Sequence, residues 1–181
     1  MAIADVGGGV SMARVVKLVA GLATAGVVLA ALAEGAGQSV PDKVGTKAPA
    51  FTATSLDGQT IDTTALAGKV VVLKFWYVAC GPCRVEIPHL NRLVEEFAGK
   101  PVVFLGLALD APDKLRLFLK EMPFAYTIVP NAESIFERFG VTLCPTHVVI
   151  DRQGTIVHFA RGGSPQTADV LRSAIKAALG E

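Results

Sequence analysis

The sequence has few cysteines and almost no surplus charge, and both shortages exclude classes of protein. Its 181 residues include three cysteines, and 17 basic against 16 acidic residues give a formal net charge of +1. No long block of one charge sign occurs, so the charge gives no reason to expect nucleic acid as a partner. The length suits one globular domain, because domains usually hold about 100–200 residues.

Long apolar runs are confined to one place, the segment Val15–Ala33, which reads VVKLVAGLATAGVVLAALA. Arg14 and Lys17 supply a basic start, and Ala31 with Ala33 fits an A-x-A cleavage site. These are the parts of a secretory signal peptide, but the segment is also long enough to remain as a membrane anchor. Both interpretations export the rest of the chain to the periplasm or the cell envelope.

We therefore divide the chain into three parts. Residues 1–33 are expected to be the signal peptide or membrane anchor, and the Gly-rich, polar stretch 34–47 a linker. Residues 48–181 form the folded domain, which opens with a small hairpin around the turn dipeptide Asp57-Gly58.

Strands and helices alternate through the rest of the domain. The β-branched and aromatic run Val70–Trp76 predicts a strand covered on both faces, and an amphipathic helix follows at 81–98, with Val85 on its apolar side and Pro88 inside it. The other predicted elements are strands at 101–109, 126–129, 146–151 and 155–160, helices at 111–122 and 132–139, and a last helix with Ser164 as N-cap, Pro165 at its first position and Gly180 after its last turn. This order predicts an α/β fold with a central mixed β-sheet and helices on both faces.

Cys80 and Cys83 stand three residues apart around Gly-Pro. A disulfide that closes so short a loop constrains the unfolded chain little, which disfavours a purely structural bridge. Structural zinc usually takes four ligands, and no second C-x-x-C pair exists. The preceding strand and following helix put Cys80 at a helix N-terminus, which stabilises a thiolate. We expect Cys80 to attack and Cys83 to resolve the mixed disulfide.

The run KVVVLKFWYVACGPCRVEIPHLNRL, with PTHVVIDRQGTIV downstream, resembles thioredoxin-fold proteins, most closely the TlpA/ResA-like group of exported thiol-disulfide oxidoreductases. The resemblance extends from Gly45 to the C-terminus and includes an N-terminal hairpin extension. It implies an enzyme without a cofactor that reduces, or less often oxidises, disulfides in exported proteins. Some members serve cytochrome c maturation. The implied partners are disulfide-bearing exported proteins and a membrane thiol protein that donates electrons.

The resemblance also implies roles for residues around the cysteine pair. Pro145 is expected to be cis and to lie against the pair. The substrate-binding residues are expected to be Trp76, Gly81, Pro82, Cys144 and Pro145.

Cys144 departs from the group's pattern, in which the residue before this proline is not cysteine. It is open to four interpretations. The thiol could attack the Cys80–Cys83 disulfide, join a mixed disulfide, complete a three-sulfur metal site, or simply be a small buried hydrophobe. The metal interpretation gives a rival function, a Cu(I)-type carrier in which His147 supplies a further ligand. A second rival, a peroxiredoxin, needs Thr or Ser where this chain has Tyr77.

Lys74 lies six residues before Cys80, where thioredoxins carry a buried acid that relays a proton. We consider three interpretations: a base with a lowered pKa, a cation that favours the thiolate, or a lysine that extends to the surface. For other polar residues we expect ordinary roles: solvated helix surface for Glu86, structural positions for His147 and His158, and opening or capping of the next helix for Asp110 and Asp113.

Overall fold

The computed structural model describes residues 38–39 and 43–181. The segment 1–33, interpreted above as a signal peptide or anchor, lies outside the described residues, as do residues 34–37 and 40–42 of the predicted linker at 34–47. In the part of the chain that is described, no helix is both long and apolar enough to cross a membrane.

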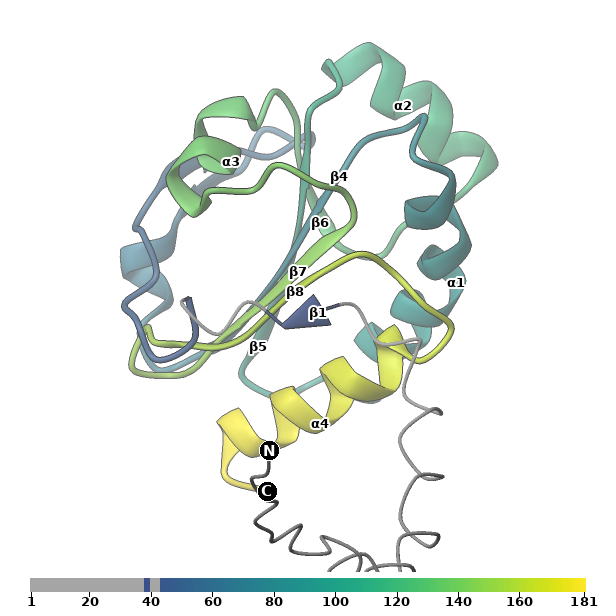
Figure 1. Cartoon of the computed structure of the whole chain (residues 1–181). Coiled ribbons are helices and arrows are strands. Elements are labelled where there is room, and N and C mark those ends of the chain that lie inside the picture. Colours follow the sequence, from purple (N-terminus) through teal and green to yellow (C-terminus); the bar gives the residue numbers. More distant parts are fainter. Residues whose placement is uncertain (1–37, 40–42) are drawn as a thin grey trace, which may run out of the picture. The chain divides into compact units, whose positions relative to one another are not determined.

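A six-stranded mixed sheet forms the centre of the domain (Figure 1). The strand order is β1-β8-β7-β4-β5-β6; the pairs β4–β5 and β5–β6 are parallel, and the other three pairs are antiparallel. The strands are β1 (Gln38–Ser39), β4 (Val70–Trp76), β5 (Val102–Ala108), β6 (Thr127–Val129), β7 (Thr146–Ile150) and β8 (Ile156–Arg161). The predicted mixed sheet is confirmed, and β4 has the predicted bounds.

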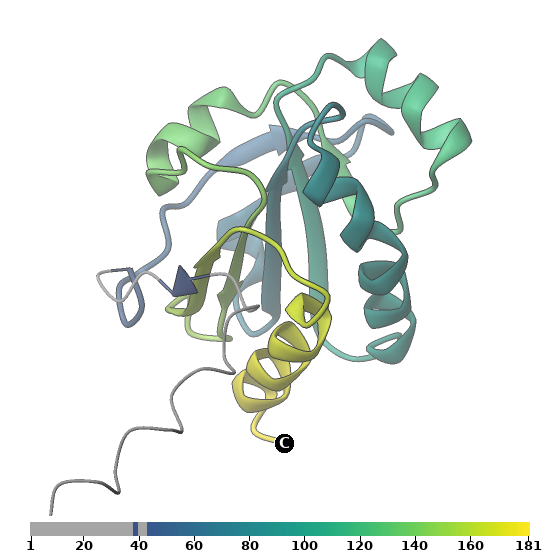
Figure 2. The same ribbon diagram turned by 45° about the vertical axis from the view of Figure 1, so that its right-hand side comes forward.

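Four helices cover the two faces of this sheet, as the two ribbon views show (Figures 1 and 2). They are α1 (Gly81–Glu96), α2 (Pro112–Glu121), α3 (Glu133–Phe139) and α4 (Thr167–Leu179). Ile87 of α1, Leu115 of α2 and Leu171 of α4 belong to one hydrophobic cluster, whereas Phe136 of α3 belongs to a second. The sheet therefore separates two cores, with α3 on one side and the other three helices on the opposite side.

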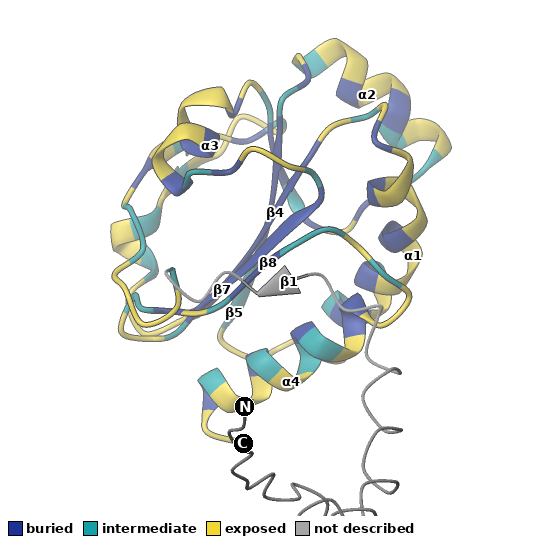
Figure 3. Cartoon of the chain, in the orientation of Figure 1, coloured by how far each residue is buried: buried dark blue, intermediate teal, exposed yellow. Residues whose placement is uncertain are grey.

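Strand β4 is the centre of both cores, and all seven of its residues are buried (Figure 3). Its side chains alternate between the faces because successive residues of a strand point in opposite directions. Val71, Leu73 and Phe75 pack toward α3, and Val72 and Trp76 toward α1. The side chain between these last two, Lys74, lies by the same alternation on the α1 face.

A separate two-stranded hairpin, β2 (Thr52–Thr54) and β3 (Thr60–Asp62), precedes β4 and is followed by the short 3₁₀ helix η1 (Thr63–Leu66). Its turn contains Gly58 at φ +80°, a left-handed conformation that glycine adopts without strain. The predicted hairpin around Asp57-Gly58 is thereby confirmed.

Two details of the helices differ from the prediction. Val85 of α1 is 70% exposed, because the buried face of this helix runs through Cys83, Glu86 and Ile87 instead. The C-terminal helix starts at Thr167 with Gln166 as its N-cap, so the prediction that Ser164 caps it is wrong. The Ser164 hydroxyl accepts from the Gln166 amide in the turn before the helix. The predicted end holds, since Gly180 is the left-handed C-cap.

Candidate active site

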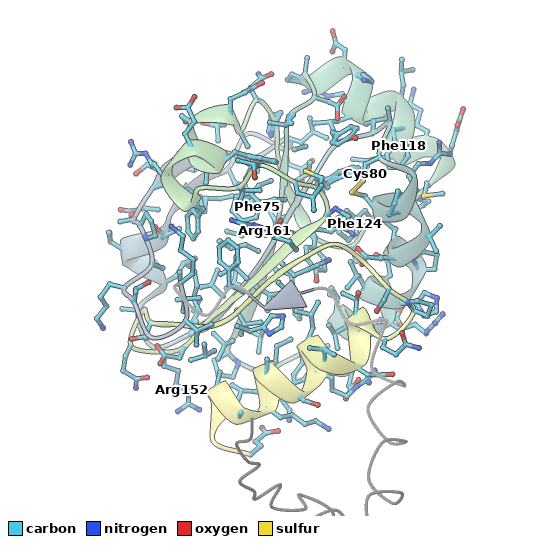
Figure 4. All side chains as sticks on the ribbon, in the orientation of Figure 1. Phe75, Cys80, Phe118, Phe124, Arg152 and Arg161 are labelled. Atoms are coloured by element: carbon cyan, nitrogen blue, oxygen red, sulfur yellow. A yellow bond between two sulfur atoms is a disulfide. The ribbon has the colours of Figure 1, made fainter. Side chains whose placement is uncertain are left out.

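The cysteine pair lies where β4 ends and α1 begins. Cys80 is the N-cap residue of α1, and Pro82 stands in the first turn, where its missing N–H costs no helical hydrogen bond. Cys80 and Cys83 form a disulfide, visible in Figure 4 beside the label of Cys80. The Cys83 amide also donates to Cys80 Sγ at 3.2 Å. The unpaired N–H groups of this helix start can stabilise negative charge on Cys80.

The two sulfurs differ in their surroundings. Cys80 retains 3% exposure, and Cys83 is fully buried behind it. Gly81 and Pro82 between them are exposed. A substrate sulfur approaching from solvent therefore meets Cys80, and Cys83 is placed to attack Cys80 from the protein side.

Pro145 follows a cis peptide bond from Cys144, as the resemblance implied. Its carbonyl accepts from the Gly162 amide at 2.7 Å, which ties the loop before β7 to the loop after β8. Pro145 is buried and Cys144 half-buried. Burial raises the pKa of the Cys144 thiol to about 11, and the charge of Lys74 opposes that shift only in part.

A cavity of about 370 Å³ opens beside this loop. Tyr77 lines it from the segment that leads to Cys80, Phe136 and Glu133 line it from α3, and residues 141–144 line it from the loop before Pro145. Of the five residues predicted to bind substrate, Cys144 lines the cavity, and Gly81 and Pro82 are exposed at the surface.

Trp76 does not fit the substrate-binding role that we expected for it. Its side chain is fully buried on the α1 face of the sheet. The centre of its ring lies 5.5 Å from the ring centre of Phe118 and 5.6 Å from that of Phe124. Figure 4 shows both phenylalanines beside the end of α1 that carries Cys80. Trp76 is therefore a core residue under the site and presents no surface to a substrate.

Beneath the cysteine pair, three ionisable side chains meet in the protein interior. Lys74 Nζ lies 2.6 Å from Glu86 Oε2, and His147 Nε2 lies 3.0 Å from the same oxygen. Lys74 Nζ also donates to the carbonyl oxygen of Cys83 at 3.2 Å. The three side chains are 0%, 4% and 1% exposed. We call Lys74, Glu86 and His147 the buried charge cluster.

This cluster excludes one interpretation of Lys74 and corrects the prediction for Glu86. Lys74 does not extend to the surface, and Glu86 is not part of the solvated surface of α1. The two remaining interpretations of Lys74, base or cation, are both compatible with its position. His147 is buried, as expected of a structural residue, but it also contacts the Glu86 carboxylate that pairs with Lys74.

Hydrogen bonding decides how the protons are arranged. A carboxylate only accepts hydrogen bonds, so the contact requires the hydrogen of His147 to sit on Nε2. His147 Nδ1 then carries a lone pair, and this atom and Glu86 Oε1 are buried without hydrogen-bond partners among the described residues.

Burial and charge act in opposite directions on the cluster. Burial alone raises the pKa of Glu86, but the donors His147 and Lys74 outweigh it and lower that pKa to about 2. Burial lowers the pKa of His147 and of Lys74, and Glu86 opposes both shifts. We assign a neutral His147 at neutral pH, because burial lowers its pKa, and an ammonium–carboxylate pair between Lys74 and Glu86, because the two buried groups lie 2.6 Å apart and each favours the charged form of the other.

Asp110 has a role that the sequence did not show. It does not cap α2, whose N-cap is Ala111 without a side-chain hydrogen bond. Instead its Oδ2 accepts from the Val78 amide at 2.6 Å, and its Oδ1 pairs with Lys114. Asp110 thus fixes the segment between β4 and Cys80. Asp113 lies in the first turn of α2 and pairs with Arg116 at the surface.

Signals for the cluster were present in the sequence. Lys74 interrupts a run of apolar residues in a strand that we predicted to be buried. Glu86 lies three residues after Cys83 and next to Ile87, on the buried stripe of α1. What the sequence could not show is that these three positions meet at one carboxylate oxygen.

The three-sulfur metal site of the rival function is not assembled here. Within residues 43–181 no group of three or more His, Cys, Asp or Glu side chains is arranged to hold a metal ion. Cys80 and Cys83 are bonded to each other, and Cys144 is a free thiol.

Comparisons with known proteins agree with this site. A profile of the AhpC/TSA family matches residues 44–159, a range that includes both cysteines of the pair. Thiol-disulfide oxidoreductase ResA of Bacillus thuringiensis subsp. konkukian is 30% identical over 136 residues, which cover 74% of this chain and 78% of the relative.

Solved structures show a similarity of comparable extent. A protein from Chlorobium tepidum assigned as thiol:disulfide interchange protein DsbE has a TM-score of 0.70 and 30% identity, with 76% of this chain and 98% of that chain covered. A secreted disulfide oxidoreductase of Mycobacterium tuberculosis, described as homologous to DsbE of E. coli, has a TM-score of 0.61 and 28% identity, with 70% and 95% covered. This chain is thus similar to disulfide-exchange proteins of the ResA and DsbE type.

Proposed function

We propose that this protein works outside the cytoplasm and reduces disulfide bonds of exported proteins. The premise of this proposal is that the chain belongs to the AhpC/TSA family and is a thiol-disulfide oxidoreductase. The observation that carries the proposal is the Cys80–Cys83 disulfide at the start of α1, in which Cys80 retains 3% exposure and Cys83 is fully buried. The cis proline Pro145, one residue from the half-buried Cys144, supports it.

The reaction needs only the two cysteines of this chain. In the reduced enzyme, the Cys80 thiolate attacks one sulfur of a substrate disulfide, and the other substrate sulfur leaves as a thiolate that takes up a proton. Cys83 then loses its proton and attacks Cys80 Sγ, which releases the second substrate sulfur. Two electrons pass to the substrate, and the enzyme is left as the disulfide present in this structure.

Two observations and one requirement of the proposed cycle support an extracytoplasmic site of action. The segment Val15–Ala33 has the sequence features of an export signal. The Mycobacterium tuberculosis relative is described as secreted. The proposed cycle needs a second thiol protein to reduce the Cys80–Cys83 disulfide again, and a membrane protein that carries electrons across the membrane meets this need outside the cytoplasm.

The proposed substrate class includes proteins with C-x-x-C-H haem-attachment sites, because some members of the TlpA/ResA-like group serve cytochrome c maturation. Such a site can form a disulfide between its cysteines, and haem attachment requires both as thiols. Gly81 and Pro82 are exposed beside Cys80, so a short extended peptide of this kind can approach the cysteine pair over them.

The test uses the full chain in its reduced form with a C-x-x-C-H peptide that carries an internal disulfide, and a C-x-x-C-A peptide as a matched control. We expect wild-type protein to reduce the peptide, Cys83→Ser to stop at a protein–peptide mixed disulfide that mass spectrometry detects, and Cys80→Ser to be inactive. Reduction of both peptides at equal rates would contradict a haem-site preference. A reduction potential near the ~−120 mV of DsbA, rather than the ~−270 mV of thioredoxin, would contradict the reducing direction.

A further inference from the structure

The ammonium group of Lys74 has a complete set of partners inside the protein. It donates to Glu86 Oε2 at 2.6 Å and to the Cys83 carbonyl at 3.2 Å, and it lies 5.9 Å from the centre of the Phe124 ring. Lys74 has no exposed surface. Its charge is therefore held in one place, directly under the first turn of α1.

The same contacts place this charge next to the buried half of the disulfide. The carbonyl that accepts from Lys74 belongs to Cys83, whose own sulfur is fully buried. Coulomb interactions in the protein interior are several times stronger than in water. Any negative charge that forms on the Cys83 sulfur during reduction will therefore interact with the Lys74 ammonium.

Other ionisable groups near Lys74 leave Glu86 as its direct counter-charge. From β7, His147 contacts the same Glu86 oxygen, and burial lowers its pKa. Burial raises the pKa of Tyr126, which precedes β6, and that of Cys144, which precedes β7. These three groups are neutral at pH 7. On β5, the residue opposite Lys74 is Gly106, which carries no charge.

We propose that Lys74 is a positioning residue that stabilises the Cys83 sulfur as a thiolate in the reduced enzyme, so that Lys74 raises the reduction potential of the Cys80–Cys83 pair and Glu86 offsets part of that effect. Reduction places two electrons in the Cys80–Cys83 bond and breaks it, and each sulfur then takes up a proton or remains a thiolate. A cation beside Cys83 favours the second outcome at that sulfur and so favours the reduced form. The inference rests on the dithiol chemistry but on neither the substrate nor the direction of the proposed function.

The proposal predicts changes of opposite sign for the two members of the ion pair. Lys74→Gln removes the cation and shifts the equilibrium toward the disulfide. Glu86→Gln removes the anion, while its side-chain amide oxygen can still accept from Lys74, and it shifts the equilibrium toward the dithiol at every pH at which Lys74 keeps its proton. A purely structural role would alter the stability of both variants but would not move the potential in opposite directions.

The experiment is a redox equilibrium of the full chain with glutathione and glutathione disulfide at pH 7, with the Cys80–Cys83 state read by mass spectrometry after thiol alkylation. We expect Lys74→Gln to change the equilibrium constant by about tenfold toward the disulfide, which corresponds to about 30 mV. Glu86→Gln should change it at least threefold in the other direction. Lys74→Arg, which keeps the charge, should restore most of the wild-type value.

The matched control is the surface pair Lys100–Glu181, whose atoms lie 2.7 Å apart with side chains 39% and 43% exposed. Lys100→Gln is expected to leave the equilibrium constant unchanged. If Lys74→Gln does not fold because Glu86 loses its partner, the Glu86→Gln arm decides alone. An unchanged constant in both variants, or a shift of Lys74→Gln toward the dithiol, would overturn the proposal.

A second readout assigns the effect to Cys83. In a Cys80→Ser/Cys144→Ser background, Cys83 is the single remaining thiol of the chain. Its thiolate absorbs at short ultraviolet wavelengths and can be titrated directly. Adding Lys74→Gln should raise the pKa of Cys83 and adding Glu86→Gln should lower it, whereas equal titrations in the three proteins would overturn the proposal. Neither readout uses a protein substrate, so failure of the peptide test above leaves this inference intact.

Discussion

Lys74 Nζ and Glu86 Oε2 lie 2.6 Å apart in the interior, with the lysine on the central strand and the glutamate on the helix that carries the cysteine pair. The contact joins β4 to α1 immediately below the redox site. Removing one member of such a pair typically costs about 3–5 kcal/mol, because it leaves an uncompensated buried charge. The ion pair is thus positioned to couple the stability of the α1 start to the charge state of the site.

Acidification should destabilise the oxidised protein in two steps. Burial, assisted by the nearby His147, lowers the pKa of His158 from 6.5 to about 4. As the pH falls, the unfolded chain therefore binds a proton at His158 at a higher pH than the folded protein does. The contribution of His158 to the free energy of unfolding is fully present above pH 6.5 and is lost as the pH drops toward 4. Glu86, with its pKa lowered from 4.5 to about 2, adds a second loss between those values.

Urea unfolding of the oxidised protein at a series of pH values checks this expectation. His158→Gln should reduce the loss in the free energy of unfolding between pH 6.5 and 4 by about 1–3 kcal/mol and leave the loss at lower pH unchanged. His89→Gln removes a histidine from the exposed face of α1 and serves as the control. A profile for His158→Gln that coincides with wild type between pH 6.5 and 4 would show that His158 does not carry the first step.

Gly163 is required by close packing beside the site. A Cβ at this position would overlap Glu86 Oε1 and lie 2.9 Å from Pro145 Cγ. We expect Gly163→Ala to lower the free energy of unfolding by about 1–3 kcal/mol, as overpacking does in other well-packed interiors. In the control Gly81→Ala the added Cβ meets no atom within 4 Å, so stability should be unchanged or higher. Equal stability of Gly163→Ala and wild type in urea unfolding would show that the loop moves aside without cost.

The fold was predictable because its signals are local. The run Val70–Trp76 is apolar except at Lys74, and that pattern alone gave the bounds of β4. The start of α4 was not predictable in the same way. The sequence SPQT offers several capping residues, and the structure uses the Ser164 and Thr167 hydroxyls inside the turn, with no side-chain cap on the helix itself.

The candidate site was predictable only where a motif is contiguous. Cys80 and Cys83 lie within four residues, so spacing and context were enough to place them at a helix start. The buried charge cluster joins residues 12 and 61 positions apart, and its existence depends on the register of β4 with β7 and on the rotation of α1. Neither quantity is fixed by local propensity, which is why Glu86 was misplaced at the surface.

Asp110 should be needed for the segment that leads to Cys80. Asp110→Ala leaves the Val78 amide without its partner at 2.6 Å, and we expect a loss of about 1–3 kcal/mol in the free energy of unfolding. Asp113→Ala is the matched control, since this carboxylate is 96% exposed and its pairing with Arg116 should contribute less than about 1 kcal/mol. Equal losses in the two variants would indicate that the Val78 contact contributes nothing beyond a surface ion pair.

Cys144 should behave as a slow thiol in the oxidised protein. It is the single free cysteine when Cys80 and Cys83 are bonded, it is half-buried, and its pKa is raised to about 11. Because the thiolate is the reactive species, alkylation by iodoacetamide should be slow at pH 8. Its rate should then rise about tenfold per pH unit until the pH reaches the pKa of the thiol. Mass spectrometry of the full chain over time measures the rate.

The rate of alkylation distinguishes between the interpretations of Cys144 given above. Cys144 is a free thiol in the oxidised protein and is protonated at neutral pH, so it adds neither a bond nor a charge to the Cys80–Cys83 pair, and Cys144→Ser should leave the glutathione equilibrium of the pair unchanged. Fast alkylation at pH 7 would instead show an accessible thiolate and would favour direct attack on the disulfide. In that case a Cys83→Ser protein should form a Cys80–Cys144 bond on oxidation, which peptide mapping detects. Slow alkylation together with an unchanged equilibrium would leave Cys144 as a packing residue of the cavity beside Pro145.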